Sequence, residues 1–67
     1  MKLSTRNQLK ATVKSIETAG LMSKVVLDVG GQTITSMITA DAVTELELKA
    51  GDHVAAMVKS TSVMVAK

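Results

Sequence analysis

The sequence predicts an all-β fold, a five-stranded OB-like Greek-key barrel with one short helix between strands 3 and 4. Apolar and polar residues alternate with period two over most of the 67-residue chain, which is the pattern of half-buried β-strands. Turn residues, several of them glycine, separate the alternating runs. One segment changes to helical spacing after the third run. This order of elements matches the OB-fold, and an SH3-like barrel is the main alternative.

The alternating runs place the strands. We expect strands at residues 9–18, 21–29, 32–39, 53–59 and 62–66. The alternation slips near Ser15, which predicts a bulge in the first strand. Gly30-Gly31 joins the second and third strands, because two glycines accept the positive φ of a tight hairpin turn at little cost.

Residues 39–46 interrupt the alternation. Val43 and Leu46 are three positions apart, so both fall on one face of a short helix of about two turns. Asp41 is a candidate N-cap for this helix. Thr39 could also cap the helix with its hydroxyl, or donate that hydroxyl to a bound anion.

Composition limits how so short a chain is stabilised. A domain of about 60 residues buries only about 60% of its unfolded surface, and small domains usually add disulfides, a metal or oligomerisation. The chain has no Cys, one His and no aromatic residue, which leaves oligomerisation. Further apolar side chains lie on strand faces opposite the expected core: Val26, Met37, Met57 and Met64. We expect other subunits to cover them.

Several classes of function find no support in the residues. A single histidine, His53, allows no Ser-His-Asp site, and no pair of carboxylates has a spacing that requires acid–base catalysis, so we expect no enzyme. The net charge of +2 is mild. No apolar run approaches the ~18 residues of a membrane span, and no signal-peptide pattern is visible. The expected location is the cytoplasm.

Two polar clusters rich in hydrogen-bond donors flank the alternating region. Ser4 and Arg6 lie just before the first strand, and Lys59 and Ser60 end the fourth. Together they offer donors and fixed positive charge without a carboxylate, so they could bind a small oxyanion without transforming it. Each cluster alone is also typical of a solvated terminus or a polar turn.

The turn between the first two strands is a further candidate. Backbone N–H groups of residues 19–23 and the Ser23 hydroxyl could form a nest for an anion. A simple hairpin explains the same residues.

The chain resembles a known family over essentially its whole length. The opening Ser4-Thr5-Arg6-Asn7-Gln8-Leu9 resembles the Ser-Ala-Arg-Asn-Gln-Leu start of the molbindins, the small molybdenum-pterin-binding (Mop) proteins. The likeness continues through residues 25–31, 34–39, 43–52, 58–60 and 63–64. The combination of these stretches makes the resemblance specific.

The resemblance implies an OB-type subunit assembled as a homohexamer, a trimer of dimers, that binds molybdate or tungstate between subunits. The family's intersubunit pocket corresponds here to Ser4, Arg6, Thr39, Lys59 and Ser60. Members also bind oxyanion near the threefold axis through the first hairpin, which corresponds to Leu21, Met22 and Ser23. Many members have Asn at one of the last two positions, so the second site matches less closely.

The implied function is storage or homeostasis of molybdenum in the cytoplasm by a single Mop domain over residues 1–67, with no metal atom coordinated directly by side chains and no nucleic-acid or membrane partner. An OB-fold nucleic-acid-binding module is the alternative. Such modules stack bases on aromatic side chains, which this chain lacks. A regulatory domain that acts by contacting a partner protein is a third hypothesis.

Overall fold

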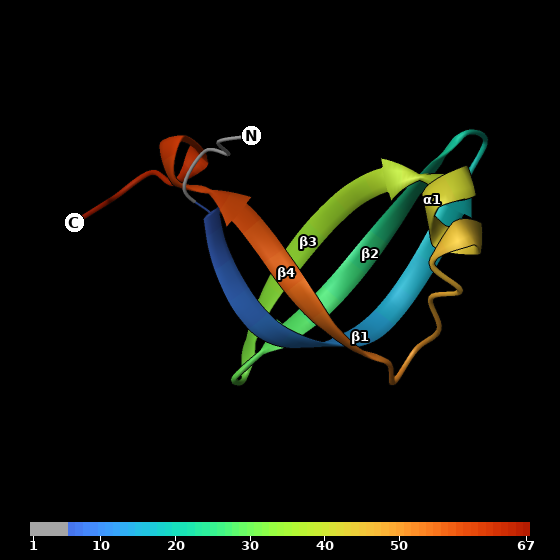
Figure 1. Cartoon of the computed structure of the whole chain (residues 1–67), viewed down its shortest axis with the longest axis horizontal. Helices are drawn as coiled ribbons and strands as arrows, with labels where there is room; N and C mark the ends of the chain where they lie inside the picture. The colour runs from blue at the N-terminus through green and yellow to red at the C-terminus, as the bar shows by residue number, and fades with distance from the viewer. Residues whose placement is uncertain (1–5) are drawn as a thin grey trace, which may run out of the picture.

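The computed structural model describes residues 6–67 and confirms the all-β class. The elements are β1 (Arg6–Ala19), β2 (Met22–Val29), β3 (Gln32–Thr39), α1 (Ala40–Glu45), β4 (His53–Lys59) and the short 3₁₀ turn η1 (Ser60–Ser62). The strands form one antiparallel sheet in the order β3-β2-β1-β4. β4 returns after α1 to lie beside β1, which is the predicted Greek-key connection (Figure 1).

β1 joins the two halves of the sheet. Its residues 6–12 pair with β4, and its residues 12–19 pair with β2. The register with β2 shifts between Val13 and Ser15, which confirms the predicted bulge. A bulge bends its strand, and β1 curves along the bottom of the fold from one side to the other (Figure 1).

The segment before β4 pairs with the backbone at this bulge. Val13 N–H donates to the Asp52 carbonyl oxygen at 2.9 Å, and Gly51 N–H donates to the Val13 carbonyl oxygen at 2.8 Å. The Asp52 carboxylate accepts a hydrogen bond from Lys49 N–H at 2.8 Å. These bonds satisfy the backbone groups of Val13 just beyond Thr12–His53, the last pair of the β1–β4 ladder, and they fix where β4 begins.

The turn between β2 and β3 has the predicted glycine geometry. Gly30 and Gly31 have φ values of 58° and 89°, so both lie in the left-handed region that a type I′ turn requires. The Asp28 carboxylate accepts a hydrogen bond from Gly31 N–H at 3.2 Å. Glycine is needed here because a side chain disfavours this backbone conformation.

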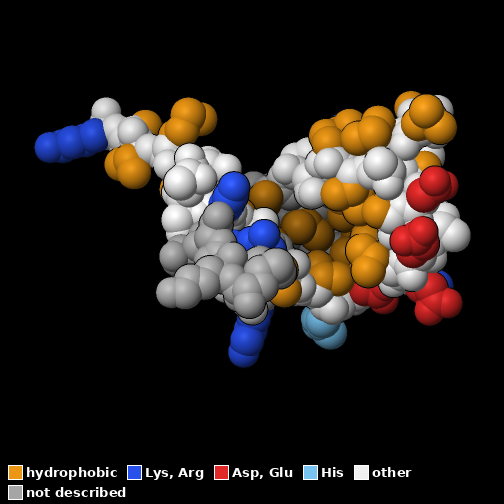
Figure 2. Space-filling view, turned by 45° about the horizontal axis from the view of Figure 1, so that its top comes forward, with side chains coloured by type: hydrophobic (Ala, Val, Ile, Leu, Met, Phe, Trp, Pro, Cys, Tyr) orange, Lys and Arg blue, Asp and Glu red, His pale blue; other side chains and the backbone are white. Residues whose placement is uncertain are grey.

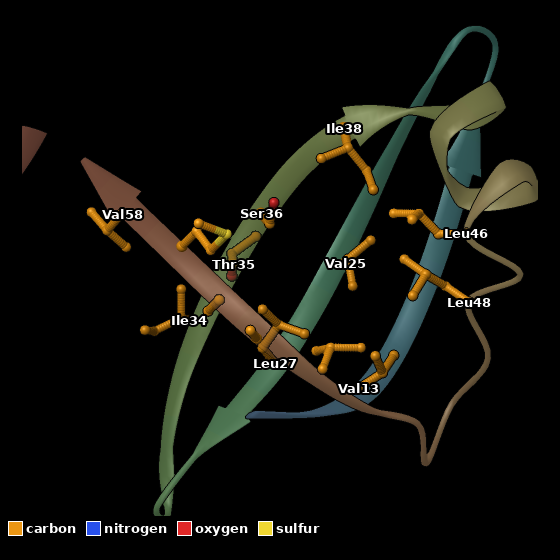
Figure 3. A pocket seen from close by; sticks show the side chains of 14 residues that line it. Val13, Val25, Leu27, Ile34, Thr35, Ser36, Ile38, Leu46, Leu48 and Val58 are labelled. Carbon is orange, nitrogen blue, oxygen red and sulfur yellow. The ribbon is translucent and has the colours of Figure 1, made fainter. Parts of the chain in front are cut away.

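The core lies on the concave face of the sheet. Its buried apolar residues are Ala11, Val13, Val25, Leu27 and Ala56. Half-buried side chains from all four strands and α1 pack against it. The same face holds a groove of about 540 Å³ lined by residues of all four strands and of the segment after α1, and it is visible as an apolar hollow in Figure 2. In Figure 3, Val25, Leu46 and Leu48 point toward one another across it.

The prediction of a fifth strand at residues 62–66 is wrong for the single chain. Residues 60–62 form η1, and residues 63–67 have no regular structure. Met64 and Val65 are 93% and 94% exposed. A strand needs a neighbouring edge to pair with, and the C-terminal segment runs away from the sheet (Figure 1). The alternation of Val63 and Val65 therefore does not produce a strand here.

Apolar side chains also cover part of the convex face, as the sequence predicts. Met37 and Met57 are 59% and 53% exposed, and Val26 is half-buried. All three lie opposite the core face of their strands. The single chain thus exposes methionines on its convex face as well as an open groove on its concave face.

The N-cap of α1 is Thr39, which confirms one of the two predicted caps and excludes the other, Asp41. Ala42 N–H donates to Thr39 Oγ1 at 3.0 Å. Thr39 has extended backbone angles because it is still the last residue of β3, which is the conformation that an N-cap needs. Asp41 instead lies inside the first helical turn.

The C-terminus of α1 forms a Schellman motif with a non-glycine residue at its left-handed position. Leu48 N–H donates to the Val43 carbonyl oxygen, and Glu47 N–H donates to the Thr44 carbonyl oxygen, both at 3.1 Å. Glu47 has a φ of 53°. This position normally holds glycine, because a Cβ atom makes the left-handed conformation unfavourable.

Replacing Glu47 with glycine should therefore stabilise the fold. We expect Glu47→Gly to raise the free energy of unfolding by about 1 kcal/mol, measured by chemical denaturation at fixed protein concentration. Glu45→Gly is the matched control, since Glu45 ends the helix with ordinary geometry; it should lower the free energy by about 0.5–1 kcal/mol. Equal effects of the two changes would contradict the role of strain at Glu47.

Candidate functional site

Arg6 and Lys59 face each other across the β1–β4 pair. They are opposite residues in the antiparallel register, so their side chains leave the sheet on the same face. By alternation this is the convex face, since the neighbouring core residue Ala56 points to the other side. Both residues are exposed, and neither forms an ion pair within residues 6–67.

Ser60, a third residue predicted for the site, lies at the same end of the β1–β4 pair as Arg6 and Lys59. Ser60 follows Lys59 directly and begins η1, and its carbonyl oxygen accepts a hydrogen bond from Val63 N–H at 3.4 Å. Ser4 lies outside the described residues. β1 already includes residues 6–8, ahead of the predicted start at Leu9, because these polar residues pair with β4 although they lack an alternating apolar pattern.

Thr39 lies at the opposite end of β1 from Arg6. It pairs with Met22 of β2, which in turn pairs with Ala19 at the end of β1. One chain therefore does not bring Thr39 together with Arg6 and Lys59. The Thr39 oxygen accepts the cap bond from Ala42 N–H, and the hydroxyl hydrogen is still available for donation to an anion.

The first hairpin places its candidate residues beside Thr39. The Leu21 carbonyl oxygen accepts a hydrogen bond from Ala40 N–H at 2.9 Å, which ties the hairpin to the start of α1. Leu21 and Met22 are 86% and 40% exposed. Ser23 is fully buried, and its hydroxyl is hydrogen-bonded to the Thr18 hydroxyl at 2.7 Å. The structure thus groups Thr39 with the residues predicted for the second site.

Charge is distributed unevenly between the Thr39 end and the Arg6–Lys59 end of the molecule. Asp41, Glu45 and Glu47 lie in or just after α1, at the Thr39 end. Figure 2 shows carboxylates gathered on the right of the molecule and several Lys or Arg side chains on the left. The one ion pair found between described residues joins Lys24 Nζ to Glu17 Oε2 at 3.7 Å. The Arg6–Lys59 end is therefore the part of the described surface most suited to attract an anion.

The residues that the structure describes contain neither a cluster of metal ligands nor a membrane-spanning helix. No group of three His, Cys, Asp or Glu side chains within residues 6–67 is arranged to hold a metal ion. His53 is exposed, and its Nδ1 lies 3.4 Å from Thr12 Oγ1. No helix in the same range has the length and hydropathy needed to cross a membrane.

Sequence reasoning missed one residue of this region. Asn7 donates from its side-chain Nδ2 to the Val58 carbonyl oxygen at 3.3 Å, one position from the Arg6–Lys59 pair. The position of Asn7 within the opening motif could have drawn attention to it, but nothing in the motif indicates which strand Asn7 contacts.

Comparison with known proteins finds close relatives along the whole chain. Residues 3–65 match the family model of the TOBE domain. The chain is 46% identical over 66 residues to molybdenum-pterin-binding protein 2 of Clostridium pasteurianum, which covers 97% of both chains.

Solved structures show the same fold at similar identity. A molybdate-binding protein from Sporomusa ovata superposes with a TM-score of 0.91 at 46% identity and full coverage of both chains. The cytoplasmic molybdate-binding protein ModG, solved with molybdate bound, gives a TM-score of 0.86 at 46% identity over 96% of this chain and 46% of ModG. Because the matches combine this identity with nearly complete coverage, the chain belongs to the TOBE-domain family and, within it, to the molybdenum-pterin-binding proteins.

Proposed function

We propose that this chain binds molybdate, or the nearly isosteric tungstate, as an intact oxyanion held by donors from more than one subunit. The observation that carries the proposal is the Arg6–Lys59 pair, which sets two cations on one sheet face without a carboxylate partner among the residues described. The relatives named for binding molybdate or molybdenum-pterin support the choice of anion.

The chemistry of the donors suits this anion. Molybdate at neutral pH is a tetrahedral dianion with four acceptor oxygens and no proton, so its pocket must offer donors only. Arg6 and Lys59 would neutralise its charge, and the hydroxyls of Ser4, Ser60 and Thr39 would fix its oxygens. Charge-assisted hydrogen bonds contribute about 1.5–3 kcal/mol each. Several of them, less the costs of desolvation and ordering, fit micromolar or tighter binding.

The same donors discriminate against other oxyanions in different ways. Phosphate carries a proton near neutral pH, so one of its O–H groups would face a donor. Sulfate has the correct charge but is smaller, so the size of the pocket must select against it.

A pocket containing all five residues needs more than one copy of the chain, because Thr39 lies at the far end of β1 from Arg6. We infer a homohexamer built as a trimer of dimers. Its support in the single chain is the exposed apolar surface on both faces of the sheet and along the C-terminal segment. A small core without aromatic residues gains stability when such surfaces are buried between subunits.

The biological role that fits is storage or homeostasis of molybdenum by a single binding domain over residues 1–67 in the cytoplasm. The relative ModG is described as cytoplasmic, and the donor set contains no group suited to transforming the anion. A second oxyanion site at Leu21, Met22 and Ser23 stays a prediction. Because the Ser23 hydroxyl is bonded to Thr18, exposed backbone N–H groups would have to supply most of its donors.

Removing the guanidinium should weaken binding without dispersing the assembly. We expect Arg6→Ala to lower molybdate affinity by about tenfold to a hundredfold, measured by calorimetry, because charge-assisted hydrogen bonds are lost. Lys10→Ala is the matched control: it removes a cation from the same face of β1, away from the pair, and should change affinity less than about threefold. Unchanged affinity in Arg6→Ala would exclude Arg6 from the site.

The molecular mass of the purified protein in solution tests the proposed homohexamer. A homohexamer of a 7.0 kDa chain has a mass of about 42 kDa, which light scattering or native mass spectrometry resolves from a dimer or monomer. Molybdenum analysis of the same sample tests occupancy. A monomer at micromolar protein would contradict both the assembly and a pocket shared between subunits.

Thr39 allows its structural role to be separated from anion binding. Aspartate caps helices as well as threonine does, but its carboxylate offers no donor and repels a dianion. We expect Thr39→Asp to keep the free energy of unfolding within about 0.5 kcal/mol while molybdate affinity falls at least about tenfold. Thr39→Ser, which keeps the hydroxyl, should retain both properties. Wild-type affinity in Thr39→Asp would remove Thr39 from the pocket.

A further inference from the structure

Asn7 links the two strands that carry the cation pair. Its Nδ2 donates to the Val58 carbonyl oxygen at 3.3 Å, and Asn7 and Val58 are opposite residues in the register. This rung of the sheet directly adjoins the Arg6–Lys59 rung. It is the side-chain bond between β1 and β4 nearest to the start of the described chain.

The side chain of Asn7 is not placed to touch an anion held by the pair. Neighbouring residues of a strand point to opposite faces, so Asn7 leaves the sheet on the face opposite to Arg6 and Lys59. Its effect on the pair must therefore act through the backbone of the two strands.

A strand end is where such a bond has most effect. Terminal rungs open more easily than central ones because backbone pairing restrains them from one side only. Lys59 is the last residue of β4, and its partner Arg6 is the first described residue of β1. Two donors hold an oxyanion well only when their separation is fixed to within about 0.5 Å, so fraying at this rung would weaken both contacts.

We propose that Asn7 is a positioning residue that holds Arg6 and Lys59 in register for anion binding. This inference rests on the proposed function, because the pair is taken to contact the anion. It assigns Asn7 no contact of its own with the ligand.

Calorimetry with molybdate tests the role through a matched pair of variants. Asn7→Ala should lower molybdate affinity about tenfold, because the two cations of the Arg6–Lys59 pair would be held less firmly relative to each other. Thr12→Val is the control, since Thr12 makes a cross-strand contact with His53 at the other end of the same strand pair. Thr12→Val should bind as tightly as wild type. Wild-type affinity in Asn7→Ala would overturn the proposal.

A double-mutant cycle separates positioning from general stability. If Asn7 acts through Arg6, then adding Asn7→Ala to Arg6→Ala should cost much less affinity than it does in the wild type. An equal loss in both backgrounds would assign Asn7 to the fold as a whole and overturn the positioning role.

Hydrogen exchange provides a readout that needs no anion. Asn7→Ala should speed amide exchange at residues 6–8 and 57–59, and leave residues 10–12 unchanged. If wild-type protein binds no molybdate while this local change occurs, the proposed function fails and the restraint of the pair by Asn7 stands. If molybdate binds and exchange at residues 6–8 is unchanged, the positioning role fails and the proposed function stands.

Discussion

The rest of the structure depends on the division of β1 between two partners. Residues 6–12 of the strand pair with β4 and residues 12–19 pair with β2, and the bulge between Val13 and Ser15 lies just after the point where the two ladders meet. A straight strand could not place both partners around one concave core. Pairing with β4 sets Arg6 opposite Lys59 at one end of β1. Pairing with β2, and of β2 with β3, places Thr39 near the other end of β1. The pairing of β1 with two strands therefore determines both the shape of the core and the positions of the candidate site residues.

The open groove and the exposed methionines follow from the small size of the chain. Four strands and one short helix leave a concave apolar face that a single copy does not close. Val, Ile, Leu, Ala and Met supply the whole core because the chain has no aromatic residue. Assembly would bury this surface and, in the same step, bring Thr39 of one copy to the cation pair of another. Stability and ligand binding would then be gained together.

Much of the fold could be predicted from the sequence because period-two alternation is a local signal. The first four strands, the bulge near Ser15 and the Gly30-Gly31 turn were predicted from such patterns and are confirmed. The fifth strand was predicted at residues 62–66 but does not form, because the alternation at Val63 and Val65 carries no information about a partner edge. For the helix cap, the sequence left both Asp41 and Thr39 as candidates, and the extended backbone of Thr39 and its bond from Ala42 N–H decide between them. For the site, the motif indicated Arg6 and Lys59, but the bond from Asn7 to Val58 depends on a register that distant residues set.

The pairing of the first strand with the last also orders events during synthesis. β1, β2 and β3 are consecutive hairpin neighbours, so they can pair as soon as they leave the ribosome. The half of β1 that carries Arg6 must wait for residues 53–59, the last strand to be made. A truncated nascent chain would hold a meander and no cation pair. If the cation pair holds the anion as proposed, a chain could take part in binding only after its translation has passed β4.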